Sequence, residues 1–451
     1  PEPRLWSPEH PNLYVARCTL RTETGAETLS ARFGFREFWI EGRTFVLNGV
    51  PVRLLGESHY RYGRLPASAD PATGRDFNRE MLGVLRQELA FNSVRVHASI
   101  GPGTVALGAD EAGVMLVNQS SIWSAMGGHY RRGGRTFLAR TEKEFAEWVQ
   151  RDRNSPSVVI WDVENEMIRG GRENLPWVME LDRFVLAHDD TRPIQHSGAG
   201  WYDKNQEIVH LHMQEHYSGI FEKWETSGTR PLVVGEFWIG GRGETRLPSS
   251  LEFTSRNEWF EEEARLYEEA LLEMRARGIS GAMPFRVSNS LLAPPDDGRD
   301  FLDFEPGAPP AFAIRSENAR AAIVHGLRAV TAFFWPRRET AAAERRSTRR
   351  LVVCNDSETS RQLTVRWHLG SRPEEARVVP LSPGEQAAIP VVFTAPSECT
   401  DLYATLTENG HTLAEDSLRI RVIPARVLRP PQPHRNVRVY DPEHTLTPWL
   451  E

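Results

Sequence analysis

The chain has 451 residues, which is too long for one ordinary core and indicates about three domains, or one large barrel with smaller attachments. Hydrophobic residues make up 40% and charged residues 25% of the sequence, so the composition excludes general disorder. The net charge is −7 and the basic residues are scattered, which argues against a nucleic-acid-binding protein. No apolar run approaches the roughly 18 residues of a membrane span, so a membrane is not expected as a partner either.

The three cysteines are too few and too dispersed for a disulfide framework or a zinc cage. Cys354 and Cys399 share one C-terminal segment and could pair. The chain begins without Met and without a charged-then-apolar leader, so the sequence does not indicate a compartment.

Residues 1–42 contain short alternating apolar runs bounded by Pro, Gly and Asn, with a turn at TETGAET. This pattern predicts two or three β-strands. So few strands cannot bury both of their faces by themselves. We therefore expect this segment to be the end of a β-sandwich whose earlier strands are absent.

From residue 43 to 335, short apolar runs alternate with helical stretches. The eight runs cover 52–59, 93–99, 113–119, 157–166, 193–200, 208–217, 231–238 and 279–287. Helices are predicted between them at 77–90, 135–152, 177–188 and 257–278. Nearly continuous apolar runs indicate parallel strands covered by helices, and eight of them predict a (β/α)₈ TIM barrel. An open doubly wound sheet is the alternative, but no Gly-rich phosphate loop follows the first run.

The C-terminal part returns to a β pattern. A Pro-, Ala- and Arg-rich connector at 336–349 is predicted to be a linker. Six β runs at a spacing of about ten residues then predict a second β-sandwich over 350–425. Residues 426–451 are predicted to form a tail.

Two of the predicted barrel strands end in carboxylates. The fourth ends in Glu164, Asn165 and Glu166, and the seventh ends in Glu236. Active sites of such barrels lie at the carboxyl ends of the strands, so these glutamates can face one another across a cleft. Glycoside hydrolysis needs such a pair, because one acid protonates the leaving oxygen and one carboxylate attacks the sugar. A single glutamate there is more often a helix cap or an ion-pair partner.

The chain resembles glycoside hydrolase family 2, whose members include β-galactosidases, β-mannosidases and β-glucuronidases. The resemblance rests on LWSPEHPNLY, RFGFREF, FVLNGVPVRLLGESH, SVRVHAS, GADEAGVMLV, RNSPSVVIWDVENE and PLVVGEFW, which follow in the family's order. It covers residues 4–238 closely. It implies that residues 1–42 end an immunoglobulin-like domain, that the family's N-terminal sugar-binding domain is missing, and that the chemistry needs neither a metal nor another cofactor.

The resemblance also implies roles for single residues. Glu166 becomes the acid/base, Glu236 becomes the nucleophile, and Asn165 binds the 2-hydroxyl of the sugar. Glu164 stays open as the acid, because residues two apart on an extended strand point the same way. We expect a raised pKa for Glu166, supplied by Trp161, Glu236 and partial burial.

Further candidates resemble the family's −1 subsite. His59 and Arg95 match positions that build this subsite, whereas His97 is equally compatible with a packed core histidine. Burying Arg95 unpaired would be costly, so we expect it to reach a carboxylate, most plausibly a catalytic one. Tyr217, at the end of the sixth run, could hydrogen-bond the nucleophile and hold it ionised, or it could be a core tyrosine.

Aromatic and basic residues follow several of the runs. Trp123, Trp201 and Trp238 could stack on sugar rings, although each could equally belong to the core. Arg286 stands where the family often has an aromatic floor. It could favour a carboxylate or sulfate substituent, or form a salt bridge within the barrel.

The sequence therefore predicts a retaining, exo-acting β-glycosidase with a carbohydrate substrate. One alternative is a catalytically silent carbohydrate-binding protein on the same barrel. Another is a metallohydrolase that uses His210, His212 and His216, which the sixth run carries. The sugar and the linkage are not indicated, and a homo-oligomer stays open.

Overall fold

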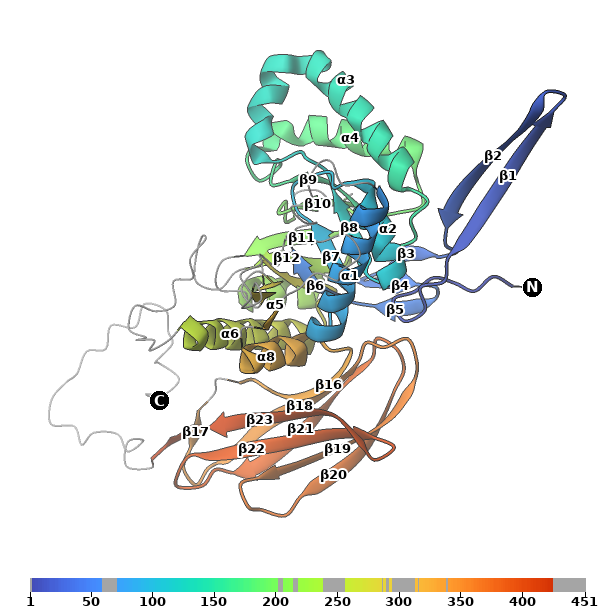
Figure 1. Cartoon of the computed structure of the whole chain (residues 1–451). Coiled ribbons are helices and arrows are strands. Elements are labelled where there is room, and N and C mark those ends of the chain that lie inside the picture. The colour runs from blue at the N-terminus through green and yellow to red at the C-terminus, as the bar shows by residue number, and fades with distance from the viewer. Residues whose placement is uncertain are drawn as a thin grey trace. The chain divides into compact units, whose positions relative to one another are not determined.

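The computed structural model describes residues 2–58, 71–201, 206–213, 218–237, 256–285, 287–288, 292–293, 313–314, 316–337 and 340–424 (Figure 1). These residues form two compact units. The first contains the described residues up to Ala329 together with Asn355–Ser360 and Ser382–Glu385. The second contains Val330–Cys354, Arg361–Leu381 and the described residues from Gln386 onward.

Eight parallel strands form one sheet in the first unit, in the order β10-β9-β8-β7-β6-β13-β12-β11. They are β6 (Leu54–Ser58), β7 (Ser93–Val96), β8 (Met115–Gln119), β9 (Val158–Asn165), β10 (Ile194–Ser197), β11 (Val209–Met213), β12 (Leu232–Phe237) and β13 (Gly281–Pro284). Each strand lies within one of the eight predicted runs. Near the two edge strands, the Gly200 N–H donates to the His210 carbonyl at 2.9 Å. The sheet is therefore a nearly closed TIM barrel, and the open doubly wound alternative is wrong.

Helices surround this sheet (Figure 1). They are α1 (Pro71–Leu89), α2 (Gly103–Ala112), α3 (Gly127–Asp152), α4 (Leu175–His188), α5 (Ser218–Ser227), α6 (Arg256–Ala276) and α8 (Glu317–Leu327), with the 3₁₀ turns η1 (Ser124–Met126) and η2 (Arg172–Asn174). The four predicted helices are confirmed as α1, α3, α4 and α6. Helix α2 was not predicted, because small residues interrupt its apolar pattern. Gly108 allows α2 to approach α1 closely, since a Cβ at this position would lie 2.6 Å from the backbone nitrogen of Arg79 in α1.

Two small antiparallel sheets precede the barrel. Strands β1 (Tyr14–Thr22) and β2 (Gly25–Phe33) form the predicted hairpin. Strands β3 (Phe38–Glu41), β4 (Thr44–Leu47) and β5 (Val50–Val52) form the second sheet. This second sheet crosses the predicted domain boundary at residue 42, so the barrel does not begin there as a separate body. That the hairpin ends an immunoglobulin-like domain stays a prediction.

The apolar face of the second sheet packs against the barrel interior. Its members join interior residues in one buried cluster: Trp6, Phe38, Phe45, Leu47, Leu54, Met115, Val117, Val159, Ile160, Ile208, Val233 and Met283. Most of the barrel residues in this cluster lie near the amino ends of their strands. We call this cluster the barrel base. It occupies the end of the barrel opposite to the strand termini that carry the candidate glutamates.

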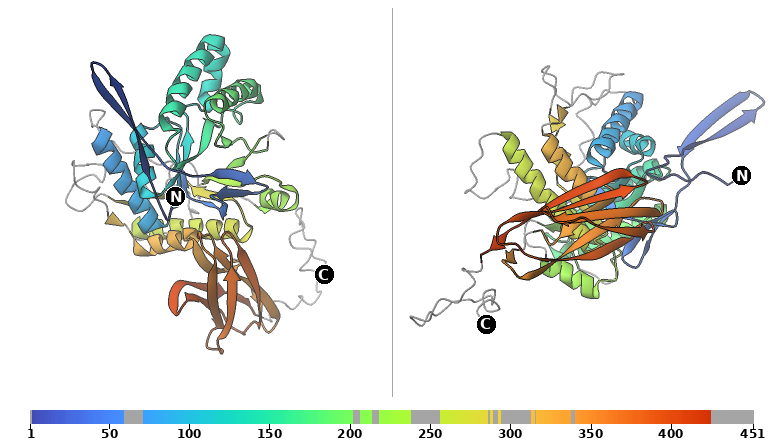
Figure 2. Two further views of the ribbon diagram at one scale, coloured as in Figure 1. Left: turned by 90° about the vertical axis from the view of Figure 1, so that its right-hand side faces the viewer. Right: turned by 90° about the horizontal axis from the view of Figure 1, so that it is seen from below.

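The second unit is a β-sandwich, as predicted, and Figure 2 shows its strands as two layers. One layer contains β16 (Val330–Trp335), β18 (Arg346–Asn355) and β21 (Gln386–Thr394), and the other contains β20 (Glu375–Leu381), β19 (Arg361–Leu369), β22 (Thr400–Glu408) and β23 (His411–Ile420). Strands β17 (Ala341–Ala342) and β24 (Val422–Ile423) form a short additional pair in this unit. A similar short pair in the first unit consists of β14 (Leu292–Ala293) and β15 (Ala313–Ile314). Residues of both layers share one apolar core.

Two predicted boundaries of this unit are wrong. Its first strand, β16, begins at Val330, so the barrel does not extend to residue 335. The segment 336–349 is no linker, because it contains β17 and the start of β18. The Arg-rich start of β18 concealed the strand, since several of its side chains face solvent. The predicted tail, 426–451, lies outside the described residues.

The remaining predictions on composition concern cysteine pairing and membranes. None of the three cysteines forms a disulfide in the described residues, so Cys354 and Cys399 do not pair. Among the helices that the structure describes, none is both long and apolar enough to cross a bilayer.

Candidate active site

A buried arginine organises the carboxyl ends of the barrel strands. Arg95, at the third position of β7, is completely buried. Its Nε donates to Asp162 Oδ2 at 2.9 Å, and its Nη2 donates to Asn165 Oδ1 at 2.6 Å. Its Nη1 donates to both Ser58 Oγ and Glu236 Oε1, each at 2.7 Å. The expectation that Arg95 reaches a carboxylate is thus confirmed, and one of its partners is the candidate nucleophile.

Glu236, near the end of β12, is only 5% exposed. The same Oε1 atom that binds Arg95 lies 3.1 Å from His97 Nδ1 and 3.6 Å from His212 Nε2. Burial by itself raises the pKa of Glu236, but the neighbouring His212, Arg95 and His97 together bring this pKa well below its ordinary value. Glu236 is therefore ionised, which is the state that a nucleophile requires.

Glu166 follows the last residue of β9 and has a left-handed backbone, with φ at 57°. Such a backbone is uncommon outside glycine and is typical of functional sites. The Oε1 atom of Glu166 lies 2.9 Å from His212 Nδ1 and 2.9 Å from Arg169 Nη1. The hydrogen bond from His212 lowers the pKa of Glu166 and outweighs partial burial, while the charge of Arg169 lowers it further. The expected raised pKa of Glu166 is wrong for this structure.

His212, in β11, lies between the two glutamates. Its side chain is fully buried, its Nδ1 contacts Glu166, and its Nε2 faces Glu236. Gly198, after β10, makes this arrangement possible. It has a φ of 74°, and a Cβ there would lie 2.8 Å from His212 Nδ1 and 3.0 Å from Glu166 Cγ. The imidazole of His212 therefore binds Glu166 through Nδ1 and lies near Glu236 on its Nε2 side.

Two family models match this chain. The one described as "Glycosyl hydrolases family 2, TIM barrel domain" matches residues 36–239, and the one described as "Glycosyl hydrolases family 2" matches residues 1–36. Together they cover more than half of the 451 residues. The chain belongs to glycosyl hydrolases family 2. The resemblance seen in the sequence is confirmed, and the barrel match includes both Glu166 and Glu236.

Solved structures share the fold of this family 2 chain. The β-D-mannosidase from Dictyoglomus thermophilum has a TM-score of 0.65 at 15% identity, covering 93% of this chain and 58% of that one. Bacteroides uniformis β-glucuronidase 2, covalently bound to cyclophellitol-6-carboxylate aziridine, has a TM-score of 0.54 at 19% identity, with coverages of 94% and 52%. A β-galacturonidase from Eisenbergiella tayi, bound to galacturonate, has a TM-score of 0.51 at 22% identity, with coverages of 63% and 52%. The chain thus spans between half and three fifths of the length of these proteins.

Glu164, the alternative acid, does not share the surroundings of Glu166. Its side chain is fully buried, and its Oε2 accepts a hydrogen bond from the Met167 N–H. The pairing of β9 with β10 skips Val163, because Asp162 pairs with Gln195 and Glu164 with the next residue, His196. Glu166 itself lies beyond β9 with a left-handed backbone, so the strand alternation behind the prediction that the two glutamates point the same way does not apply to this pair. Burial raises the pKa of Glu164 to about 8.

The proposed metal ligands of the sixth run do not form a metal site within the described residues. His210 Nδ1 accepts a hydrogen bond from the Gly198 N–H at 3.0 Å, and His212 Nδ1 binds Glu166. His216 lies outside the described residues. In the part of the chain that the structure covers, the His and carboxylate atoms with a metal-like spacing belong to Glu9, His10 and Glu358 instead.

The other predicted binding residues have mixed outcomes. His97 contacts Glu236, as noted above. Trp201 is partly buried against the barrel core, and Lys223 Nζ lies 5.1 Å from its ring centroid. Trp123 is 45% exposed and its backbone pairs with Asn165. His59, Tyr217, Trp238 and Arg286 lie outside the described residues.

Asp162, Ser58 and Arg169 contact the site but were not predicted. Asp162 also accepts hydrogen bonds from Gln119 Nε2 at 2.8 Å and from Ser197 Oγ at 2.5 Å. Ser58 and Asp162 are polar residues in largely apolar strands, and this pattern could have identified them. Arg169 lies in a turn, where the sequence carries no comparable pattern.

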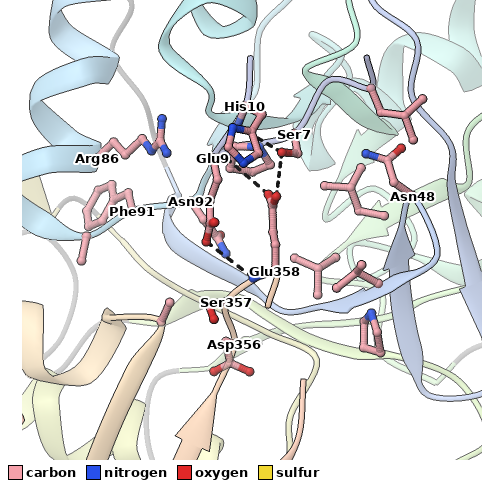
Figure 3. Close-up of a pocket in the computed structure, with 18 of the residues that line it drawn as sticks. Ser7, Glu9, His10, Asn48, Arg86, Phe91, Asn92, Asp356, Ser357 and Glu358 are labelled. Atoms are coloured by element: carbon pink, nitrogen blue, oxygen red, sulfur yellow. Dashed lines mark hydrogen bonds between the residues drawn. The ribbon is translucent and has the colours of Figure 1, made fainter. Parts of the chain in front are cut away.

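A cavity of about 510 Å³ lies elsewhere in the first unit (Figure 3). Val52 and Asn92, which line it, stand just before β6 and β7, so the cavity lies toward the amino ends of these strands. Ser7 Oγ donates to Glu358 Oε2 there at 2.9 Å. Barrel enzymes of this type carry their active sites at the opposite, carboxyl ends of the strands. We therefore place the candidate active site at Glu166 and Glu236 and not in this cavity.

Proposed function

We propose that this chain is the catalytic part of a retaining β-glycosidase that releases terminal β-linked sugars. The observation that carries the proposal is the placement of Glu166 and Glu236 on the two nitrogens of His212, at 2.9 and 3.6 Å. Retaining enzymes use two carboxyl groups about 5 to 5.5 Å apart. We propose this course because the chain belongs to glycosyl hydrolases family 2 and both glutamates lie at the carboxyl ends of its barrel strands. The similar structures named above are a β-mannosidase, a β-glucuronidase and a β-galacturonidase, which supports the proposed β-specificity.

In the first step, Glu236 attacks the anomeric carbon and forms a glycosyl ester. The bond to the leaving oxygen breaks, and this oxygen takes the proton of Glu166. Arg95 keeps Glu236 ionised and oriented before the attack, because it binds the attacking carboxylate at 2.7 Å. Asn165, which the Arg95 guanidinium holds at 2.6 Å, is the proposed partner of the 2-hydroxyl.

In the second step, Glu166 acts as a base. It removes a proton from water, and the water oxygen attacks the anomeric carbon and breaks the ester to Glu236. The sugar leaves with its original configuration, Glu236 is an anion again, and Glu166 carries the proton for the next cycle.

The acid has to be protonated before the first step, whereas its present contacts favour the ionised form. His212 and Arg169 both stabilise the negative charge of Glu166. We propose that substrate binding weakens at least one of these two contacts. Arg169 is the more accessible of the two, because its side chain is 49% exposed and that of His212 is fully buried.

The first experiment compares Glu236→Ala with Glu166→Ala on aryl β-glycosides of galactose, glucose, mannose, glucuronate and galacturonate. Glu236→Ala should lose activity on every substrate, because no attacking group remains. Glu166→Ala should lose about 10²- to 10⁴-fold on poor leaving groups but keep turnover of dinitrophenyl glycosides, which need no proton. Azide should accelerate this second variant and yield a β-configured glycosyl azide.

Glu164→Gln serves as the matched control, since it changes a neighbouring carboxyl that does not contact Glu236 and should leave turnover near the wild-type level. An α-configured azide, or a first-formed sugar of inverted configuration, would contradict the retaining mechanism. Wild-type protein that turns over none of the five glycosides would favour the silent carbohydrate-binding alternative.

A further inference from the structure

Arg169 is an exposed cation that touches the proposed acid/base. It lies in the turn after β9, where the Gly170 N–H donates to the Glu166 carbonyl at 2.8 Å. Its Nη1 lies 2.9 Å from Glu166 Oε1, and its side chain is 49% exposed. No other hydrogen bond or ion pair of Arg169 is found among the described residues. Most of its guanidinium therefore remains available to a ligand.

Arg95 offers a comparison within the same site. It is completely buried and binds Ser58, Asp162, Asn165 and Glu236, so it has little capacity for a further group. Each arginine thus touches one proposed catalytic glutamate, but only Arg169 is open to solvent. Because the acid/base gives its proton to the leaving oxygen, a group that contacts Glu166 lies close to the leaving group.

An aromatic residue stands on the neighbouring segment. The Asn165 N–H donates to the Ile122 carbonyl at 2.8 Å, and Trp123 pairs with Asn165. Ser124 then approaches the turn, since a Cβ on Gly170 would lie 3.4 Å from Ser124 Cβ. Trp123 is 45% exposed, so part of its surface is open to a ligand. The segments that carry Trp123 and Arg169 therefore lie side by side next to Glu166.

We infer that Trp123 and Arg169 form a leaving-group site that selects a carboxylated group, such as an acidic sugar. This inference rests on the proposed roles of Glu166 and Glu236. A guanidinium binds a carboxylate through two parallel hydrogen bonds, and an aromatic face suits the CH surface of a sugar ring. A carboxylate on the leaving group would compete with Glu166 for Arg169.

This competition links recognition to the acid step. When the leaving group binds Arg169, Glu166 loses one of the two contacts that stabilise its charge. The protonated form of Glu166 then becomes easier to populate at the moment when a proton has to be donated. A carboxylated leaving group should therefore raise kcat as well as lower KM.

The test uses paired substrates that share one glycone, namely the umbelliferyl and the 3-carboxyumbelliferyl β-glycoside. The wild type should prefer the carboxylated substrate in kcat/KM by roughly five- to tenfold relative to Arg169→Gln, as expected for one partly exposed charge-assisted contact. Arg169→Lys should keep part of this preference. The preference should shrink as salt is added, because screening weakens exposed charge pairs.

Arg131→Gln is the matched control. Arg131 is also an exposed arginine, but it pairs with Glu173 at 3.3 Å and not with a barrel carboxylate, so its removal should leave the preference unchanged. The ratio between two substrates is measured on one enzyme preparation and does not depend on the fraction that is folded. Trp123→Ala should lower kcat/KM for both substrates alike.

Equal ratios for wild type and Arg169→Gln would overturn the inference while leaving the proposed function intact. An equal loss of the ratio in Arg131→Gln would also overturn it, because the effect would then come from general surface charge. A lack of effect of Trp123→Ala would remove the indole from the proposed site. Absence of turnover on every aryl glycoside contradicts the proposed function itself.

Discussion

The two ends of the barrel are built from the same eight strands but hold opposite kinds of side chain. The barrel base is apolar: Leu54, Val159 and Val233 of the barrel strands pack there with Phe45 of β4. The carboxyl ends bury charged and polar groups instead, namely Arg95, Asp162, Asn165, His212 and Glu236. Strand residues only a few positions apart therefore contribute to very different environments.

The apolar end of the barrel therefore serves stability, and the polar end serves the proposed chemistry. Burying apolar surface stabilises the fold by roughly 25 cal/mol per Å², whereas burying an ion costs several kcal/mol that its partners must offset. The Arg95 cluster is therefore poorly suited to stabilising the barrel, but it keeps the buried Glu236 ionised. The barrel base can supply the stability that the polar end lacks. Three predictions test this division, beginning with the largest effect.

Arg95→Met should damage both properties. Asp162 and Glu236 would remain buried without their shared cation, so we expect a loss of about 3–5 kcal/mol in the free energy of unfolding. Activity should fall by several orders of magnitude, because Glu236 would lose its orientation. Urea unfolding and turnover of dinitrophenyl glycosides measure the two effects. Adding Asp162→Asn to this variant should recover part of the stability but none of the activity. An unchanged free energy of unfolding in Arg95→Met would contradict the role of Arg95 as the shared cation of Asp162 and Glu236.

Phe45→Ala should damage stability alone. The phenyl ring is completely buried in the barrel base, so its removal should lower the free energy of unfolding by about 3–5 kcal/mol. Well below the unfolding temperature, kcat and KM per folded molecule should stay at their wild-type values. A shift in the pH profile of this variant would show that the two ends of the barrel are not independent.

Glu164→Gln should change how stability depends on pH. The pKa of Glu164 rises from 4.5 to about 8 on folding, so the folded chain binds a proton that the unfolded chain releases between these values. The wild type should therefore lose stability as the pH rises from about 4.5 to 8, by up to a few kcal/mol. The variant should lack this loss, which makes it the more stable protein at pH 8 but not at pH 4. Urea unfolding across this pH range measures the free energy of unfolding of both proteins. If the difference between their two free energies stays constant with pH, the raised pKa of Glu164 is contradicted.

Much of the fold could be predicted, because each barrel strand is a short apolar run with polar or Gly-containing residues around it. The two glutamates were predictable for a related reason, since they directly follow or end such runs. The contact between Arg95 and a carboxylate followed from the cost of burying an unpaired charge. These features depend on local sequence or on one strong physical constraint.

The rest depended on geometry that local sequence does not determine. The direction of Glu164 follows from the register shift at Val163, and that of Glu166 follows a left-handed backbone that a glutamate rarely adopts. The contact of His212 with Glu166 requires Gly198, which follows β10. The start of the second unit at Val330 was missed, because the segment after it is rich in charged residues.

The contacts of Arg95 also have a consequence for the order in which the protein assembles. Ser58, Asp162 and Asn165 belong to the stretch from β6 to β9, whereas Glu236 arrives with β12. A chain that emerges from the ribosome can therefore pair Arg95 with Asp162 well before the seventh strand has been made. In the sheet, β12 lies between β11 and β13, and β13 joins it to β6. The contact of Arg95 with Glu236 therefore forms only after these later strands have joined the sheet, and a partly assembled barrel lacks the charged surroundings of the proposed nucleophile.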